Sequence, residues 1–134
     1  EKIENELSLK IQKIFETKGE SFFRKIEEKI TLKTLKKSKN VISIGGGAFL
    51  NQNIRNEILQ NHISFWLDWN PKTLINRISN SFKRPVAFKA SKNELLELIN
   101  KRSKIYSKAL YKVNCENLTK NQIVTKILKI YEDH

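Results

Sequence analysis

The chain has 134 residues, enough for one domain with its own hydrophobic core. Its formal net charge is +12, but the lysines are spread over nearly every segment, without zinc-finger spacing or a basic strand with interleaved aromatic residues, which disfavours nucleic acid as the main partner. No apolar run approaches the roughly 18 residues of a membrane span and the first residues do not resemble a signal peptide, so we expect a cytoplasmic protein without a membrane partner.

The first part of the chain predicts three helices and one strand. Apolar residues at helical spacing indicate helices over residues 2–17 and 19–37, with Gly19 as the boundary between them. The short β-branched run at residues 41–44 predicts a buried strand. A polar stretch over residues 51–61 predicts the third helix.

The second part predicts strands that alternate with helices, as in an α/β fold with a parallel sheet. The helix expected at residues 70–80 has Asn70 as its N-cap and Pro71 as its first helical residue. Thr119 is the expected cap of the last helix. Residues 81–93 contain Pro85 and show little periodicity, so we predict a loop there. The strands and helices are expected, in chain order, at residues 63–67, 70–80, 93–110, 111–115 and 119–134.

Three of the four glycines of the chain stand together at residues 45–47, directly after the predicted strand at 41–44. In an open α/β sheet, ligands bind beyond the carboxyl ends of the strands. Glycines at such a place let a ligand approach the main chain and allow a positive φ. The alternative is a tight turn that needs one or two glycines, but three in succession favour a loop that faces a ligand.

Residue counts single out the arginines and one cysteine. Only five of the 26 basic residues are arginines, so lysine serves wherever a solvated charge suffices. An arginine fork can bind a carboxylate or phosphate through two hydrogen bonds, or stack on a flat ring, which marks the arginines as candidate site residues. The single cysteine, Cys115, has no partner for an intramolecular disulfide, and we expect it to be buried and inert.

Four short motifs occur in one order over nearly the whole chain: GExxFRxxE in "GESFFRKIE", GGG at residues 45–47, RP in "KRPVAF" and RxxxY in "NKRSKIYSKA". In this combination the chain resembles the shikimate kinases, a branch of the nucleoside-monophosphate-kinase-like P-loop fold. The resemblance implies a single domain over residues 1–134 with a three-layer α/β fold, in which helices flank a parallel sheet. The shikimate-binding helices would span residues 1–40, and core strands and helices residues 41–76. The lid region would span residues 77–92, and a C-terminal helix–strand–helix residues 93–134.

The resemblance also assigns a substrate site. Arg24 and Arg102 would hold the shikimate carboxylate, with Glu27 orienting Arg24, although a solvated surface ion pair is the alternative for Glu27. The glycine loop would line the ring and its hydroxyls. The implied substrate-binding residues are Arg24, Glu27, Gly45, Gly46, Gly47 and Arg102.

On the nucleotide side, the resemblance assigns Arg84 to a lid that closes over the transferring phosphate, where an arginine stabilises the charge of the transition state. Arg77 would stack on adenine, with Asn117, Leu118 and Thr119 near the loop on the other face of the ring. A solvated position on the helix surface is the alternative for Arg77. The proline after Arg84 is followed by "VAF" rather than the family's more usual "LL", which changes the packing of the lid but not its arginine. We expect a structural role for Arg55.

The implied reaction is the ATP-dependent phosphorylation of the 3-hydroxyl of shikimate in chorismate and aromatic amino-acid biosynthesis, with Mg²⁺, by a monomer. The family's first strand, GxxGxGK[ST] loop, helix, second strand and DxD segment do not occur in this sequence, so no metal ligand is assigned here. We expect these parts upstream in the full protein, with the first strand between those at 41–44 and 63–67; an inactive fragment is the other possibility. Alternative functions are a non-catalytic module that binds shikimate or a polyanion, and a related small-polyol kinase such as a gluconate kinase.

Overall fold

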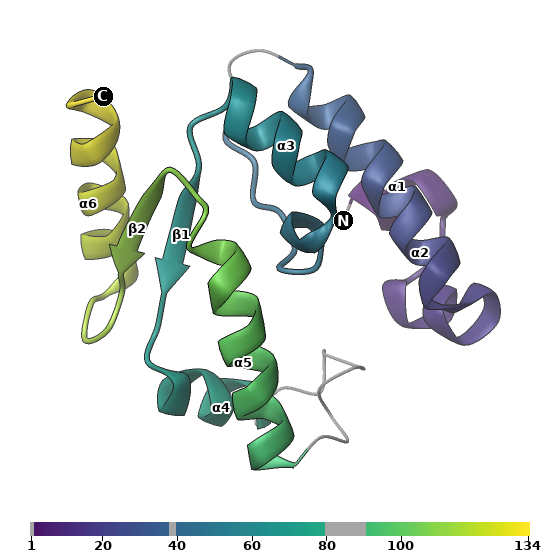
Figure 1. The fold of residues 1–134 in the computed structure, drawn as a ribbon. Helices are drawn as coiled ribbons and strands as arrows, with labels where there is room; N and C mark the ends of the chain where they lie inside the picture. Colours follow the sequence, from purple (N-terminus) through teal and green to yellow (C-terminus); the bar gives the residue numbers. More distant parts are fainter. Residues whose placement is uncertain (1, 38–39, 80–90) are drawn as a thin grey trace. The chain divides into compact units, whose positions relative to one another are not determined.

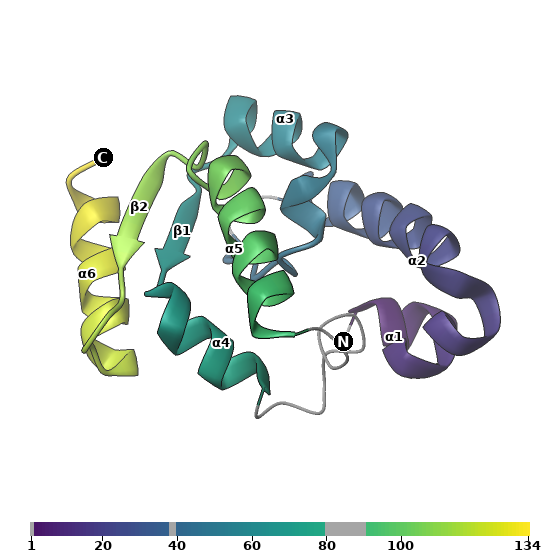
Figure 2. The same ribbon diagram turned by 60° about the horizontal axis from the view of Figure 1, so that its bottom comes forward.

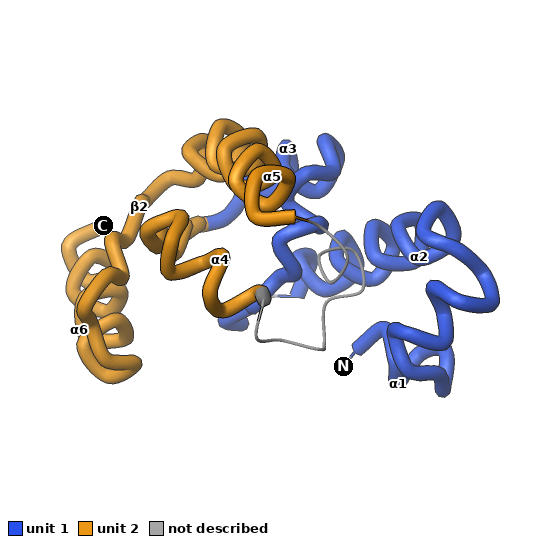
Figure 3. The backbone as a smooth tube through the Cα atoms, turned by 90° about the horizontal axis from the view of Figure 1, so that it is seen from below, with its two compact units in different colours: residues 1–62 blue, residues 63–134 orange. Residues whose placement is uncertain are grey.

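The computed structural model describes residues 2–37, 40–79 and 91–134, and the chain divides into two compact units, residues 1–62 and 63–134 (Figures 1 and 3). The single-domain assignment stays a prediction. The predicted lid arginine, Arg84, and Pro85 lie outside the described residues.

Unit 1 is built from helices. Helix α2 changes direction at Gly19, whose φ of 79° and ψ of 170° are open to glycine but not to residues with a Cβ, so the predicted boundary is a kink in one element. The predicted helix over residues 2–17 is also interrupted after Leu7, where Ser8 has a φ of 51°. The elements are α1 (Lys2–Leu7), α2 (Ile11–Leu35), the 3₁₀ turn η1 (Ala48–Leu50) and α3 (Gln52–Asn61).

The core of unit 1 lies where α2, η1 and α3 meet (Figure 1). Helix α3 presents Ile54 and Ile58, four residues apart, and both are buried. Phe23 of α2 and Phe49 of η1 are buried as well. These contacts hold the segment that precedes η1, which contains the glycine triplet, against α2.

The predicted strand at residues 41–44 is not formed. Exposed and half-buried residues alternate along it, as in a strand, and Val41 is fully exposed. A strand needs a neighbour that completes its hydrogen-bond ladder. Among the described residues β1 and β2 pair with each other, and residues 41–44 have no ladder partner there. The assignment of a buried strand at residues 41–44 was therefore wrong.

Unit 2 combines a parallel pair of strands with three helices, which confirms the predicted α/β class. β1 and β2 run parallel, with Phe65 opposite Tyr111 and Leu67 opposite Val113. Helices α4 and α5 lie side by side in the crossover between the strands (Figures 1 and 2). The elements are β1 (Phe65–Asp68), α4 (Pro71–Ser79), α5 (Lys92–Tyr106), β2 (Tyr111–Asn114) and α6 (Lys120–Glu132).

The core of unit 2 forms between β2 and α6. Val113 and Cys115 are both 0% exposed and pack with Ile123 of α6. The predicted burial of Cys115 is thus confirmed, and burial raises the pKa of its thiol above the ordinary value, which keeps the thiol neutral and unreactive. Thr119 caps α6 as predicted, because its hydroxyl accepts a hydrogen bond from the main chain of Gln122. Within the described ranges, no helix has the length and apolar character needed to cross a membrane.

Candidate functional site

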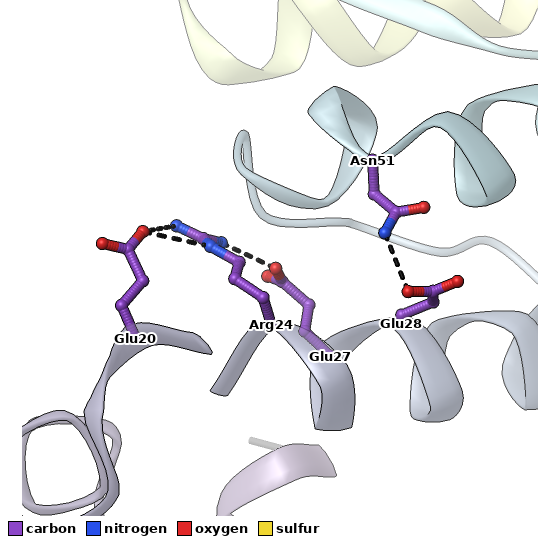
Figure 4. A network of polar contacts seen from close by, with 5 residues as sticks. All are labelled: Glu20, Arg24, Glu27, Glu28 and Asn51. Carbon is purple, nitrogen blue, oxygen red and sulfur yellow. Dashed lines mark hydrogen bonds and ion pairs between the residues drawn. The ribbon is translucent and has the colours of Figure 1, made fainter. Parts of the chain in front are cut away.

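In unit 1, the GExxFRxxE motif places one arginine between two carboxylates on α2. Arg24 Nη1 donates a 2.6 Å hydrogen bond to Glu27 Oε2, one helical turn further on (Figure 4). From the other side, Glu20 Oε1 accepts hydrogen bonds from Arg24 Nε at 3.3 Å and Nη2 at 3.1 Å. The two glutamates therefore fix the plane of the guanidinium.

The Arg24–Glu27 pair is not a solvated surface pair. The side chain of Glu27 is 10% exposed and that of Arg24 is 33% exposed. Burial opposes the charge of Arg24, but the hydrogen bonds and charges of Glu27 and Glu20 outweigh it and raise the pKa of Arg24 above its ordinary value. The guanidinium is permanently charged and partly open to solvent, as a carboxylate-binding group has to be.

The glycine triplet lies against this arginine. A Cβ atom added to Gly47 would overlap Arg24 Nη1 and lie 2.8 Å from its Cζ. A Cβ at Gly45 would lie 3.5 Å from Glu27 Oε1, which is an ordinary contact. Within the described ranges the only glycine with a positive φ is Gly19, so the positive φ expected for this loop is absent. Gly47 is needed because the guanidinium of Arg24 occupies the space of its side chain.

A third carboxylate of α2 anchors the chain that follows the glycines. Glu28 accepts a hydrogen bond from Asn51 Nδ2 at 2.9 Å (Figure 4) and another from Asn53 Nδ2 at 2.6 Å. Asn51 also caps α3 by accepting a hydrogen bond from the main chain of Ile54. Sequence reasoning missed this anchor. The N-cap signal of Asn51 was readable, but its partner lies 23 residues away.

Arg55 has the structural role expected for it. Its Nη1 donates hydrogen bonds to the main-chain oxygens of Phe49 at 3.1 Å and Leu50 at 2.9 Å. These carbonyls belong to η1, so Arg55 ties the turn after the glycines to α3. The guanidinium of Arg55 therefore stabilises the structure of unit 1.

In unit 2, Arg102 lies on α5 and its Nε is buried without a hydrogen-bond partner in the described part of the chain. A buried donor without a partner is costly and is the kind of group that a bound anion satisfies. Arg102 belongs to unit 2 and Arg24 to unit 1, so their predicted convergence on one carboxylate stays a prediction.

Arg77 is not merely a solvated residue on the surface of α4. Its Cζ lies 3.7 Å from the ring centroid of Trp69, a cation–π stack. Sequence reasoning missed Trp69. Its position directly after a strand and eight residues before an arginine gave no periodic signal for a contact between them.

The turn at residues 117–119, which was predicted to lie beside the nucleotide, has structural roles of its own. Asn117 has a left-handed backbone with a φ of 59°, and Leu118 packs against the core cluster of unit 2. The hydroxyl of Thr119 caps α6. The side chains of Leu118 and Thr119 therefore have structural roles. Contact between this turn and a ligand stays a prediction, and it would involve the outer side of the turn.

Glu116 fastens this turn to the start of α4. Its Oε2 accepts a 3.0 Å hydrogen bond from the main chain of Asn70, and its Oε1 accepts a 2.7 Å hydrogen bond from Thr73 Oγ1. The hydrogen bond from Asn70, followed by that from Thr73, lowers the pKa of Glu116 below its ordinary value, and the charge of Arg77 acts in the same direction.

Substituting Glu116 by glutamine is expected to lower the Tm at neutral pH by a few degrees and to alter its acid dependence. Because the pKa of Glu116 is lower in the folded state, its carboxylate stabilises the fold above the ordinary value of 4.5, and this stabilisation is lost as the pH falls through the folded-state pKa. The Tm difference between wild type and Glu116→Gln should therefore shrink below pH 4.5. Calorimetric scans from neutral pH into this range measure it.

Glu97→Gln on α5 is the control for this measurement, because the side chain of Glu97 is exposed and makes no hydrogen bond or ion pair within the described part of the chain. As a substitution on the surface, it is expected to change the Tm little throughout the series. The same flat profile for Glu116→Gln would contradict the role assigned to Glu116.

An open pocket of about 340 Å³ lies at the carboxyl ends of β1 and β2. Asp68, Trp69, Asn114 and Glu116 contribute to its walls. This is where ligands bind in open α/β sheets. No three His, Cys, Asp or Glu side chains gather into a metal site among residues 2–37, 40–79 and 91–134.

The family model for shikimate kinase matches residues 1–132 of the chain. Curated relatives named shikimate kinase include that of Bartonella quintana, 32% identical over all of this chain and 64% of its own length. The relative from Bacillus subtilis is 35% identical over 96% of this chain and 70% of its own length. The chain thus spans less than two thirds of the Bartonella quintana protein.

Solved structures agree in fold. The crystal structure of shikimate kinase from Aquifex aeolicus is 30% identical, with a TM-score of 0.83 over 98% of this chain and 78% of its own. Shikimate kinase from Acinetobacter baumannii in complex with shikimate is 24% identical and matches with a TM-score of 0.89 over 98% of this chain and 75% of its own, which bears on the fold alone. Together with the family match over residues 1–132, this shows that the chain belongs to the shikimate kinase family.

Proposed function

We propose that the full-length protein containing this chain is a shikimate kinase, which transfers the γ-phosphoryl group of ATP to the 3-hydroxyl of shikimate. The products are shikimate 3-phosphate, ADP and the proton released by the hydroxyl. The observation that carries this proposal is the fixed guanidinium of Arg24, held by Glu20 and Glu27 beside Gly47, in a chain whose family match covers residues 1–132.

For the acceptor, we assign Arg24 to the carboxylate of shikimate. Two glutamates already hold the guanidinium in one plane, so little rotamer freedom is left to lose when the ligand binds. Arg102 brings an Nε without a partner in the described residues and is assigned to the same carboxylate. Gly45 and Gly46 are exposed and directly precede Gly47, which contacts Arg24. All three glycines are assigned to the ring and its hydroxyls.

For the donor, we assign the adenine of ATP to Arg77 and the turn of Asn117, Leu118 and Thr119. The stack of Arg77 on Trp69 and the pocket at the strand ends support this assignment. Arg84, outside the described residues, is assigned to the transferring phosphate, where arginines of this kind contribute roughly 4 to 7 kcal/mol to transition-state stabilisation. Mg²⁺ and the chorismate pathway follow from the family and remain part of the proposal.

The test is ADP release by the full-length protein with shikimate, with gluconate and without an acceptor, with the phosphorylated product identified by phosphorus NMR. We expect release that depends on shikimate. Release with gluconate alone would indicate the related polyol kinase. Calorimetric binding of shikimate without turnover would indicate a binding module, and salt-sensitive binding of nucleic acid without binding of shikimate would indicate the polyanion alternative.

A further inference from the structure

The stack of Arg77 on Trp69 is the tightest cation–π contact among the described residues. The cation lies 3.7 Å from the ring centroid, compared with 4.8 Å for Lys112 over Trp66 and 5.2 Å for Arg24 over Phe23. At 3.7 Å the guanidinium is in van der Waals contact with the indole face. An arginine side chain on a helix surface otherwise samples many rotamers. The contact therefore selects one orientation of Arg77.

Trp69 can select that orientation because the core holds it in place. It packs against the cluster of Val113, Cys115 and Ile123, of which the first two are 0% exposed. Close-packed neighbours leave a large ring little freedom to rotate. The indole ring of Trp69 is thus a fixed platform for stacking. The guanidinium of Arg77 lies over one face of this ring, while the side chain of Arg77 remains exposed to solvent.

Glu116 fixes the distance between this platform and the nucleotide-side turn. Its carboxylate joins the turn at residues 116–119 to Asn70 and Thr73, at the start of the helix that carries Arg77. The guanidinium and the turn are therefore held by one set of contacts within unit 2. Such a preformed geometry lowers the ordering cost of binding a flat ring between them.

We propose that Trp69 is a positioning residue for the nucleotide: it holds the guanidinium of Arg77 flat, so that the opposite face of the guanidinium is a preformed wall for the adenine ring. This inference rests on the proposed function, in which Arg77 stacks on adenine. A guanidinium is planar and stacks on aromatic rings, which allows a ring on each side. Trp69 itself need not touch the ligand.

The experiment compares Trp69→Leu and Trp69→Phe in the full-length protein, because leucine keeps an apolar side chain in the core while phenylalanine also keeps a ring face. Trp69→Leu is expected to raise the KM for ATP about tenfold and Trp69→Phe about two- to threefold, because phenylalanine offers a weaker cation–π face. The KM for shikimate and the inhibition constant of inorganic tripolyphosphate, which has no base, should stay within about twofold of wild type in both variants.

Trp66→Leu is the matched control. Trp66 lies on β1, three residues before Trp69, and carries its own cation, Lys112. Its ring lies near Tyr106 of α5, whereas Trp69 packs against the cluster of Val113, Cys115 and Ile123. This variant should leave the KM for ATP within about twofold of wild type. Equal weakening of ATP, shikimate and tripolyphosphate in Trp69→Leu would indicate general damage to the fold and overturn the positioning role.

Arg77→Ala and the double variant Trp69→Leu/Arg77→Ala separate this inference from the proposed function. If Trp69 acts through Arg77, the double variant has the same KM for ATP as Arg77→Ala. A raised KM in Arg77→Ala with a wild-type KM in Trp69→Leu overturns the positioning role and leaves the adenine assignment intact. A wild-type KM in Arg77→Ala overturns the adenine assignment itself, and with it this inference.

Discussion

Replacing Arg24 by alanine in the full-length protein is expected to raise the KM for shikimate about 100-fold while changing the KM for ATP less than about threefold. A hydrogen bond to a charged group contributes about 1.5 to 3 kcal/mol, and the variant loses a two-pronged contact of this kind with the carboxylate. Initial rates with each substrate varied in turn measure both constants. Arg102→Ala is expected to act on the same substrate.

Two matched variants sharpen this prediction. Arg24→Lys keeps the charge but loses the fork, so its KM for shikimate should lie between those of wild type and Arg24→Ala. Arg55→Ala removes an arginine of the same unit whose Nη1 bonds only main-chain oxygens in the described contacts. It should lower stability without a selective effect on shikimate. If Arg24→Ala raised both KM values equally, the assignment of Arg24 to the acceptor would be wrong.

Arg24→Ala should also lower the stability of the fold, because Glu27 loses its hydrogen-bond donor. Glu27, 10% exposed, would lose the donor at 2.6 Å and keep a poorly solvated charge. We expect a loss of about 1 to 3 kcal/mol in the free energy of unfolding, measured by urea denaturation.

Substituting Gly47 by alanine is the second prediction with a large effect. The new methyl group would occupy the space of the Arg24 guanidinium, so either the loop or the arginine has to move. Because the colliding atoms are the far end of a side chain that can move aside, we expect the loss of stability to stay near the value of one hydrogen bond, about 1 kcal/mol. Because the hydrogen bond from Arg24 to Glu27 is lost or bent, we also expect a rise of about 10- to 100-fold in the KM for shikimate.

Gly45→Ala is the natural control, since its methyl group would make an ordinary 3.5 Å contact with Glu27 Oε1. Its effect on stability should stay within about 0.5 kcal/mol. In an Arg24→Ala background the collision disappears. Adding Gly47→Ala should then change neither the free energy of unfolding nor the KM for shikimate by much. Full additivity of the two substitutions would show that Gly47 is required for a reason other than Arg24.

Local signals were sufficient for much of the fold and for the motifs. Helical spacing, the caps at Asn70 and Thr119 and the break at Gly19 all depend on residues a few positions apart, and the structure contains each of them. The burial of Cys115 was likewise predicted from its residue type. The position of the glycine triplet could be read from the sequence, but the reason for Gly47 could not.

Tertiary contacts decided the rest. Residues 41–44 have the composition of a strand, but a ladder needs a neighbour, and the described residues supply none there. The contact of Gly47 with Arg24 joins positions far apart in the chain, and Glu116 reaches Thr73 across 43 residues. Periodicity and capping report only what lies within a few residues. By itself, the sequence therefore determined most of the helices, the α/β class and the pairing of Arg24 with Glu27, whereas only the packing of distant segments decided what Gly47 faces and which groups Glu116 binds.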